Sequence, residues 1–342
     1  MRRILLLMVF ALIIGTGSLF AQRGGRSPNA LEVKLGSPLP QASPWGRTLD
    51  RIASEWNRVT NGQVRLNVRH GGIEGSESKM HLSLASNSIQ AAGFTSIGLS
   101  VINPSILTMS APFLIRNERE LEAVMNEVQG DLERKINSSD YFIVAWSKSG
   151  FINIFSKEPV FSPDDLRKQR IASNPDTEDI NAAFKTMGFQ VVEMDWTEVG
   201  QKLAAGQVMA AYQNPAGVAA YQLHTVLKNM MSLNIAPVLG GIVINQVTWR
   251  RIGELNPRYQ EELVRVTRRL AGELDGVFQK TVGDAIQAMS REGLIINRPS
   301  PQQEQLWYND MEKATPVLMQ LAYDRELYQK VSDFLAKYRA QQ

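Results

Sequence analysis

The 342-residue chain contains no cysteine. This absence excludes disulfide bonds, thiolate metal sites, cysteine catalysis and lipid attachment at an N-terminal cysteine. Only three histidines occur, His70, His81 and His224, and their wide separation in sequence argues against a zinc site. Neither sign of charge is in large excess, because the net charge is +3 and falls to +1 without Arg2 and Arg3. The chain therefore gives no electrostatic case for binding nucleic acid.

Sequence motifs of common active sites are missing as well. There is no GxGxxG, GxxxxGK[ST] or GxSxG segment. The glycine-rich stretch 70–75 is interpreted as a tight turn, and Glu77 behind it as an exposed charge at a helix start. We expect no catalytic residue, no metal ion and no cofactor. An exported hydrolase that uses His224 as its base is the remaining enzyme alternative.

The first 21 residues have the pattern of an export signal. Arg2 and Arg3 precede an apolar run over residues 4–14, and Ala21 follows a Gly/Ser-rich break. The run is short for a membrane span, which needs about 20 apolar residues. We expect residues 1–21 to be a cleaved signal peptide, with a retained N-terminal anchor as the alternative, and the protein to work in the periplasm.

The remaining chain alternates between strand and helix patterns. Short strands are expected at 31–35, 64–68, 89–95, 141–146 and 151–155, and a second βαβ series begins at 170–173. Asn256 and Pro257 are typical of a helix start, and an apolar stripe continues to about residue 292. A helix of that length spans roughly 54 Å, which exceeds one small lobe. These patterns predict an α/β protein of two lobes that a long interdomain helix ties together.

Five segments, in this order, resemble the substrate-binding subunit of tripartite ATP-independent periplasmic (TRAP) transporters. They are GGIEGSESK, APFLIRN, EPVFSPDDLRKQRIA, the long segment MGFQVVEMDWTEVGQKLAAGQVMAAYQNP and APVLGGIVINQVTWRRI. The resemblance covers about residues 31–337 and is of the DctP type. It implies a two-lobed periplasmic binding protein fold with crossing segments. The first lobe is expected at 31–149 plus about 240–275, and the second at 150–239 plus about 276–338.

The most informative departure from this family is the loss of two arginines. Members typically hold a ligand carboxylate with an arginine at the position of Ala172, and many carry another at the position of Ile152. A guanidinium suits a carboxylate because it donates to both oxygens, and an enclosed carboxylate without a counter-charge is costly. We therefore predict a small, largely hydrophobic ligand. The alternative is an organic-acid binder in which another cation, such as Arg170 or Lys148, has taken over.

The resemblance also implies which residues line the cleft and which partners the protein has. Trp196 matches an aromatic residue that stacks on the ligand, and Asn214 matches a pocket asparagine, although it could equally cap the turn before Pro215. The expected partners are the ligand, the TRAP membrane permease subunits and, as in some such systems, a tetratricopeptide-repeat protein. A scaffold or sensor role through a protein partner is the alternative from another class. The full set of predicted ligand-binding residues is Phe94, Thr95, Ile152, Ala172, Asn174, Trp196, Tyr212 and Asn214.

Overall fold

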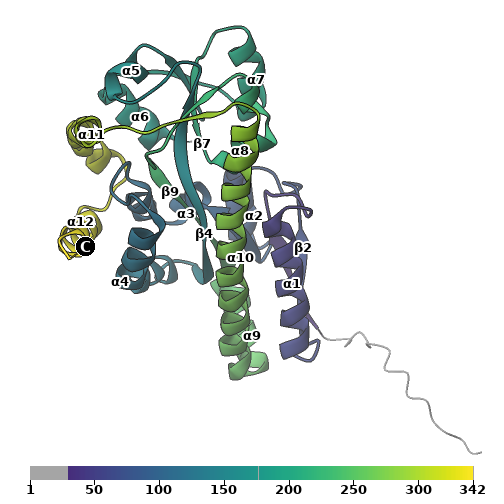
Figure 1. Cartoon of the computed structure of the whole chain (residues 1–342). Coiled ribbons are helices and arrows are strands. Elements are labelled where there is room, and N and C mark those ends of the chain that lie inside the picture. The colour runs from purple at the N-terminus through teal and green to yellow at the C-terminus, as the bar shows by residue number, and fades with distance from the viewer. Residues whose placement is uncertain (1–29, 176, 342) are drawn as a thin grey trace, which may run out of the picture.

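A computed structural model describes residues 30–175 and 177–341, so the expected signal peptide lies outside the described residues. The chain forms two α/β lobes, one above the other in Figure 1, with the long helix α10 running along both. The first lobe contains β1 (Leu31–Gly36), α1 (Pro44–Val59), β2 (Val64–Arg69), α2 (Glu77–Ala85), β3 (Ala91–Thr95), α3 (Ser96–Ile102), η1 (Pro104–Ser110), α4 (Glu118–Asn137) and α9 (Gln246–Leu255).

The second lobe is built from shorter elements. Its strands are parallel where β5 pairs with β6 and β7, as the second βαβ series predicts. The members of this lobe are α5 (Pro163–Arg167), β5 (Arg170–Ser173), α6 (Glu178–Thr186), β6 (Gln190–Glu193), α7 (Trp196–Ala204), β7 (Ala210–Gln213), α8 (Pro215–Ala220), η2 (Leu223–Thr225), β8 (Asn229–Met231) and β10 (Ile295–Asn297).

Two long strands and one helix cross between the lobes, namely β4 (Tyr141–Ser156), β9 (Ala236–Asn245) and α10 (Pro257–Arg291). The sheet runs in the order β2-β1-β3-β9-β4-β7-β5-β6, so β4 belongs to both halves. Residues 141–146 and 151–155, expected as two strands, form the single strand β4. The hydrogen-bond register with β9 shifts between Lys148 and Phe151, and Gly150 between them has φ +80°.

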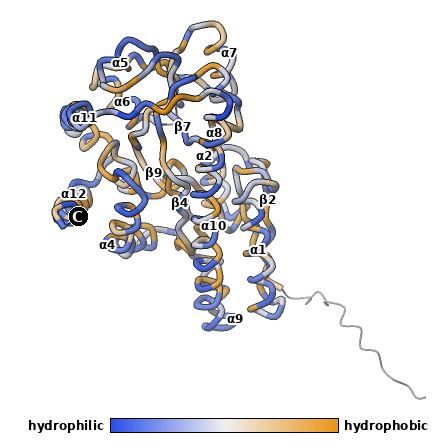
Figure 2. The backbone as a smooth tube through the Cα atoms, in the orientation of Figure 1, coloured by the Kyte–Doolittle hydropathy of each residue, from blue (hydrophilic) through white to orange (hydrophobic). Residues whose placement is uncertain are grey.

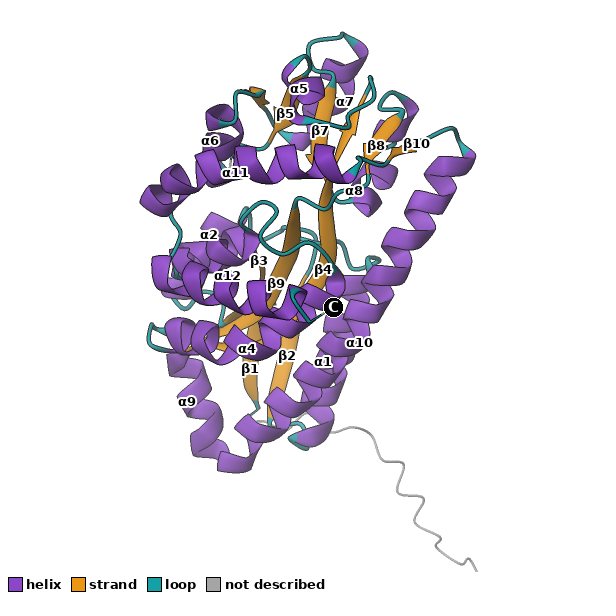
Figure 3. Ribbon diagram, turned by 60° about the vertical axis from the view of Figure 1, so that its left-hand side comes forward, coloured by secondary structure: helices purple, strands orange, loops and turns teal. Residues whose placement is uncertain are grey.

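The prediction of a long helix is confirmed. The side chain of Asn256 accepts a hydrogen bond from the amide of Arg258, and α10 then runs for 35 residues, roughly 52 Å. It packs on α1 in the first lobe, on β4 at the centre and on α8 in the second lobe. In Figure 3 the strands lie in the interior with helices on both sides.

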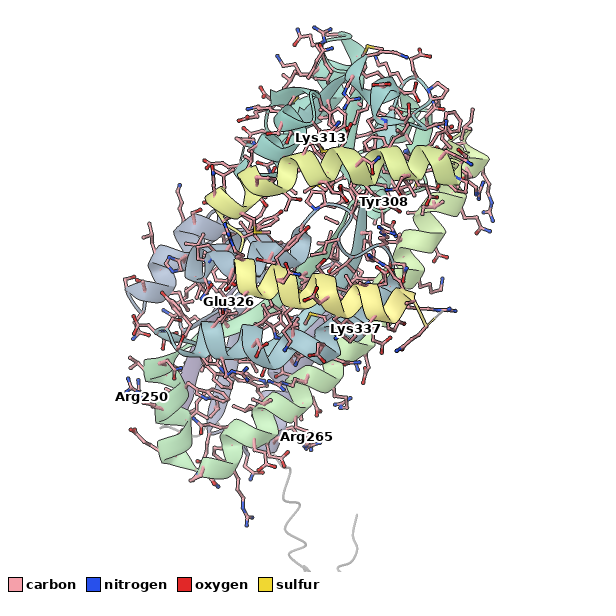
Figure 4. All side chains as sticks on the ribbon, turned by 90° about the vertical axis from the view of Figure 1, so that its left-hand side faces the viewer. Arg250, Arg265, Tyr308, Lys313, Glu326 and Lys337 are labelled. Carbon is pink, nitrogen blue, oxygen red and sulfur yellow. The ribbon has the colours of Figure 1, made fainter. Side chains whose placement is uncertain are left out.

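The last two helices form a further crossing. α11 (Pro301–Leu321) packs on α6 in the second lobe, whereas α12 (Arg325–Arg339) packs on α4 and η1 in the first. The pair Arg167–Asp310 fixes α11, and the pair Arg339–Glu120 (2.7 Å) fixes α12. In Figure 4 the two helices run roughly parallel across one face, α11 above α12, with Tyr308 on α11. The guanidinium carbon of Arg116 lies 3.6 Å from the Tyr308 ring centroid.

Apolar side chains fill the space between these layers. Figure 2 shows hydrophobic segments along the central strands and hydrophilic ones along outer helices such as α11. Trp56 of α1 and Trp307 of α11 are both fully buried. The indole nitrogen of Trp56 donates to Thr267 Oγ1 (2.8 Å) and that of Trp307 to the Phe161 carbonyl (3.1 Å), so each buried N–H has a partner.

Candidate ligand site between the lobes

A cavity of about 210 Å³ lies where the two lobes and the crossing strands meet. Strands β3, β5 and β7 all end here, so the turn that follows each strand reaches its wall. This is the usual place for a ligand in an α/β sheet. The lining residues are Thr95, Ser96, Ile97, Leu107, Ser110, Ile152, Asn174, Thr177, Asp179, Ile180, Tyr212, Gln213, Asn214, Ala236, Pro237 and Val238.

Glu77 fixes the first-lobe wall. Its carboxylate accepts hydrogen bonds from the Thr95 amide (2.6 Å), the Thr95 hydroxyl (2.8 Å) and the Gly98 amide (3.1 Å). Thr95 in turn accepts a bond from the Ile97 amide and so begins α3. The expectation that Glu77 is merely an exposed helix-start charge is wrong, because it is half-buried and orients a wall residue.

Tyr212 anchors the second-lobe wall. Its hydroxyl oxygen accepts a hydrogen bond from the Ser173 hydroxyl (2.9 Å). The Thr177 hydroxyl donates to the Asn174 carbonyl (2.8 Å), so in its contact with Tyr212 the tyrosine is the donor. Burial raises the pKa of Tyr212, which keeps this hydroxyl protonated.

Asn214 joins this wall to the crossing strand. Its side-chain oxygen accepts from the Ala216 amide (2.9 Å), which caps α8. Its side-chain nitrogen donates to the carbonyls of Ser149 (3.0 Å) and Phe151 (3.1 Å) on β4. Of the two roles considered for Asn214, the structure contains the cap, and the residue also lines the cavity.

Among the described lining residues, one carries a carboxyl group. Asp179, near the start of α6, is 6% exposed, and its Oδ2 accepts a long hydrogen bond from the Tyr323 hydroxyl (3.4 Å). Burial raises the pKa of Asp179, because the charged form loses its hydration there. Tyr323 lies between α11 and α12, so this contact links the cavity wall to the C-terminal crossing.

Neither of the cations considered as a replacement lies at the cavity. The Arg170 side chain is exposed and donates to the Gly206 carbonyl (2.7 Å). Lys148 pairs with Asp275 of α10 (3.5 Å) and lines a different pocket. Among the described residues that line the cavity there is no lysine or arginine.

The structure brings five of the eight predicted site residues together around the cavity: Thr95, Ile152, Asn174, Tyr212 and Asn214. Phe94 is buried in the first-lobe core, and Ala172 is fully buried among second-lobe residues that include Phe155 and Met194. Neither is a lining residue. The side chain of Trp196 lies outside the described residues. Ligand binding by all eight residues stays a prediction.

Three other features bear on function. His224 is buried and contacts Glu292 (2.8 Å) at the far end of α10, away from the cavity. Within residues 30–175 and 177–341, no group of three or more His, Cys, Asp or Glu side chains is placed to hold a metal ion. No helix in that same part of the chain is long and apolar enough to cross a membrane.

Comparison with known proteins gives consistent matches. A solute-binding protein of Chromohalobacter salexigens is 22% identical over 264 residues, covering 75% of this chain and 76% of the relative. A TRAP periplasmic solute-binding protein of the same organism, solved with bound D-glucuronate, superposes with a TM-score of 0.78 at 18% identity, over 88% of this chain and 99% of that one. A TRAP protein from Desulfovibrio salexigens, solved with bound orotic acid, gives 0.77 at 17%, over 90% and 99%.

These matches agree with the sequence resemblance and with the two-lobed fold. The family is one of transport solute-binding proteins, not of enzymes. The model of bacterial extracellular solute-binding protein family 7 (DctP) matches residues 35–320, and this chain belongs to that family.

Proposed function

We propose that this protein works in the periplasm, captures one small solute in the cavity between its lobes and delivers it to a TRAP-type membrane permease. The observation that carries the proposal is the composition of the cavity wall. Thr95 comes from the first lobe, Asn174 and Tyr212 from the second, and Ile152 from the crossing strand. A ligand there contacts all three parts and therefore favours the form in which the lobes are closed on it.

The chemical class of the solute is the finer question. Relatives were solved with D-glucuronate and orotic acid, and this favours the organic-acid alternative over the predicted hydrophobic ligand. The wall of this chain supports a less acidic ligand, because the described lining residues provide no cation and many apolar contacts, among them Leu107, Ile180 and Val238. Enclosing a carboxylate without a counter-charge costs several kcal/mol, of which each ~1.4 kcal/mol is tenfold in affinity.

Native mass spectrometry of the protein recovered from the periplasm tests solute capture. We expect one small adduct per chain. Val238→Trp, which places an indole in the cavity, removes the adduct, whereas Val247→Trp on α9, where Val247 is 53% exposed, keeps it. An adduct that survives Val238→Trp, or no adduct under any growth condition, contradicts the proposal.

Ile152→Arg tests the acid candidate separately. This change returns a guanidinium to a lining position that many family members occupy with arginine. If the native ligand is an acid, the variant binds it more tightly than the parent does; if the ligand is neutral or cationic, the variant binds it more weakly. Isothermal titration with the extracted ligand measures the difference.

The protein-partner alternative has its own outcome. A tight periplasmic protein partner together with an empty cavity in native spectra would favour a scaffold or sensor role. The tetratricopeptide-repeat protein expected from the resemblance stays a prediction.

A further inference from the structure

Three hydroxyl groups of the cavity wall donate their hydrogens to acceptors within the protein. The Thr95 hydroxyl donates to Glu77 (2.8 Å), the Ser96 hydroxyl to the Leu239 carbonyl (3.2 Å) and the Thr177 hydroxyl to the Asn174 carbonyl (2.8 Å). Both hydrogens of the Asn214 amide go to β4. A hydroxyl that donates inward still offers oxygen lone pairs, so these hydroxyls present acceptors to a ligand.

Two carboxyl groups lie at the described wall or directly behind it. Asp179 is a lining residue, and the Glu77 carboxylate lies one hydrogen bond behind Thr95. The described lining residues include no lysine or arginine, and the Arg170 guanidinium is held elsewhere by the Gly206 carbonyl. Acceptors and negative charge are both unfavourable for a carboxylate and favourable for a group that carries N–H donors and positive charge.

The Asp179 carboxyl group accepts hydrogen bonds from the backbone amides of Asp179 and Ile180, and a long one (3.4 Å) from the Tyr323 hydroxyl. None of these donors carries a positive charge. Burial raises the pKa of Asp179, which reflects how unfavourable an isolated negative charge is at that place. A cation within about 4–6 Å reverses this effect and favours the ionised form.

The remaining wall is apolar and the space is small. Ile97, Leu107, Ile152, Ile180 and Val238 surround it. At about 30 Å³ for each water-sized unit, a volume of about 210 Å³ corresponds to roughly seven such units, which is the size of a small organic molecule. Such a molecule needs one polar end and a short hydrocarbon body.

We infer that the ligand is a small organic amine, bound as its ammonium ion with the Asp179 carboxylate as counter-charge, the Thr95 and Thr177 oxygens as acceptors and the isoleucine side chains around its body. This inference rests on the proposed function and names the ligand class for the same cavity. It departs from the acids found in the solved relatives because the described wall carries hydroxyl acceptors and a carboxyl group and includes no lysine or arginine.

Three probes with one carbon skeleton test it: 3-methylbutylamine, 3-methylbutan-1-ol and 3-methylbutanoate. Titration calorimetry on the full-length protein at pH 7 is expected to rank the amine first, about tenfold or more tighter than the acid. Asp179→Asn should weaken the binding of the amine by about tenfold or more and change the affinity for the alcohol by roughly twofold or less. Asp140→Asn, an exposed residue before β4, makes the same charge change away from the cavity and is the matched control.

Different outcomes test the ligand class and the proposed solute capture separately. An acid that binds more tightly than the amine to the unaltered protein overturns the inference, whatever the folding of Asp179→Asn. So does the failure of all three probes to bind. In either case, if an acid such as D-glucuronate binds and Val238→Trp abolishes that binding, solute capture in the cavity stands and only the ligand class is wrong.

Discussion

The side-chain nitrogen of Asn214 lies against Gly150 of β4. A Cβ atom added to this glycine would sit 3.4 Å from that nitrogen, and the two carbonyls that the nitrogen binds belong to the residues on either side, Ser149 and Phe151. Gly150 has φ +80°, a conformation that residues with a side chain rarely adopt. Asn214 of the second lobe therefore binds β4 at the place where the register between β4 and β9 shifts.

Asn214→Ala is expected to lower the free energy of unfolding by about 2–3 kcal/mol. The change removes the cap of α8, worth about 1 kcal/mol, and leaves two β4 carbonyls without their donor. Asn256→Ala removes only the cap of α10 and should cost about 1 kcal/mol. Urea unfolding followed by circular dichroism compares the two variants, and equal losses would contradict a role for Asn214 at β4.

Ala172→Arg is expected to prevent stable folding. Ala172 has no exposed surface and lies on β5 between β6 and β7, so the new guanidinium would be buried without a partner. Such a change costs several kcal/mol, a large part of the stability of a typical domain. Arg170→Ala, on the same strand but exposed, is the control and should fold normally. A well-folded Ala172→Arg protein would show that position 172 reaches solvent or ligand.

Thr267→Val should destabilise the protein by about 1–3 kcal/mol. It leaves the buried indole N–H of Trp56 without the acceptor that now lies 2.8 Å away. Trp56→Phe removes the donor instead, and the Thr267 hydroxyl keeps its bond to the Leu263 carbonyl. The double variant should lose less than the sum of the two single variants, because no orphaned N–H remains. Additive losses in a denaturant titration would mean that the bond contributes nothing.

The pair Glu120–Arg339 should make stability depend on acid pH. Burial alone would raise the pKa of Glu120, but hydrogen bonds from Arg339 and from the Arg116 amide outweigh it, and the pKa lies below the ordinary 4.5. A lowered pKa stabilises the folded state above pH 4.5, and this contribution is lost as the pH falls through the lower folded value.

Glu120→Gln should therefore lose about 2 kcal/mol at pH 7 and show a smaller loss of stability below pH 4.5 than the parent. Asp284→Asn, in the exposed pair with Lys280, is the control and should leave the pH profile unchanged. Melting temperatures measured from pH 3 to pH 7 give the comparison. Parallel profiles for the parent and Glu120→Gln would contradict the assignment.

Local signals in the sequence predict α10 well and β4 poorly. Asn256, Pro257 and a regular apolar stripe mark the helix within its own residues. In β4 the polar and glycine residues 147–150 interrupt the apolar pattern, so the sequence suggests two strands. The pairing that keeps the strand continuous comes from β9, almost a hundred residues away, and no local pattern reveals it.

The cavity follows from the sequence only in part. The turns after β3, β5 and β7 are recognisable, and Thr95, Asn174 and Asn214 lie on them. The family pattern predicts that position 172 contacts the ligand. However, β5 is covered on both faces, and its alternation does not indicate which side chain reaches the cavity. Glu77 and Asp179 look like ordinary helix-start charges, and only the packing of distant segments gives them their partners.

The C-terminal crossing limits how the lobes can move. In Figure 1 α10 lies on one side of β4, and α11 and α12 lie on the other. Residues 322–324 connect the two ends of this second tether: the amide of Asp324 donates to Thr108 Oγ1 (2.9 Å) in the first lobe, while Tyr323 reaches Asp179 in the second. Because β4 has a connection between the lobes on each of its flanks, any rotation of one lobe against the other must displace α10, the segment from α11 to α12, or both.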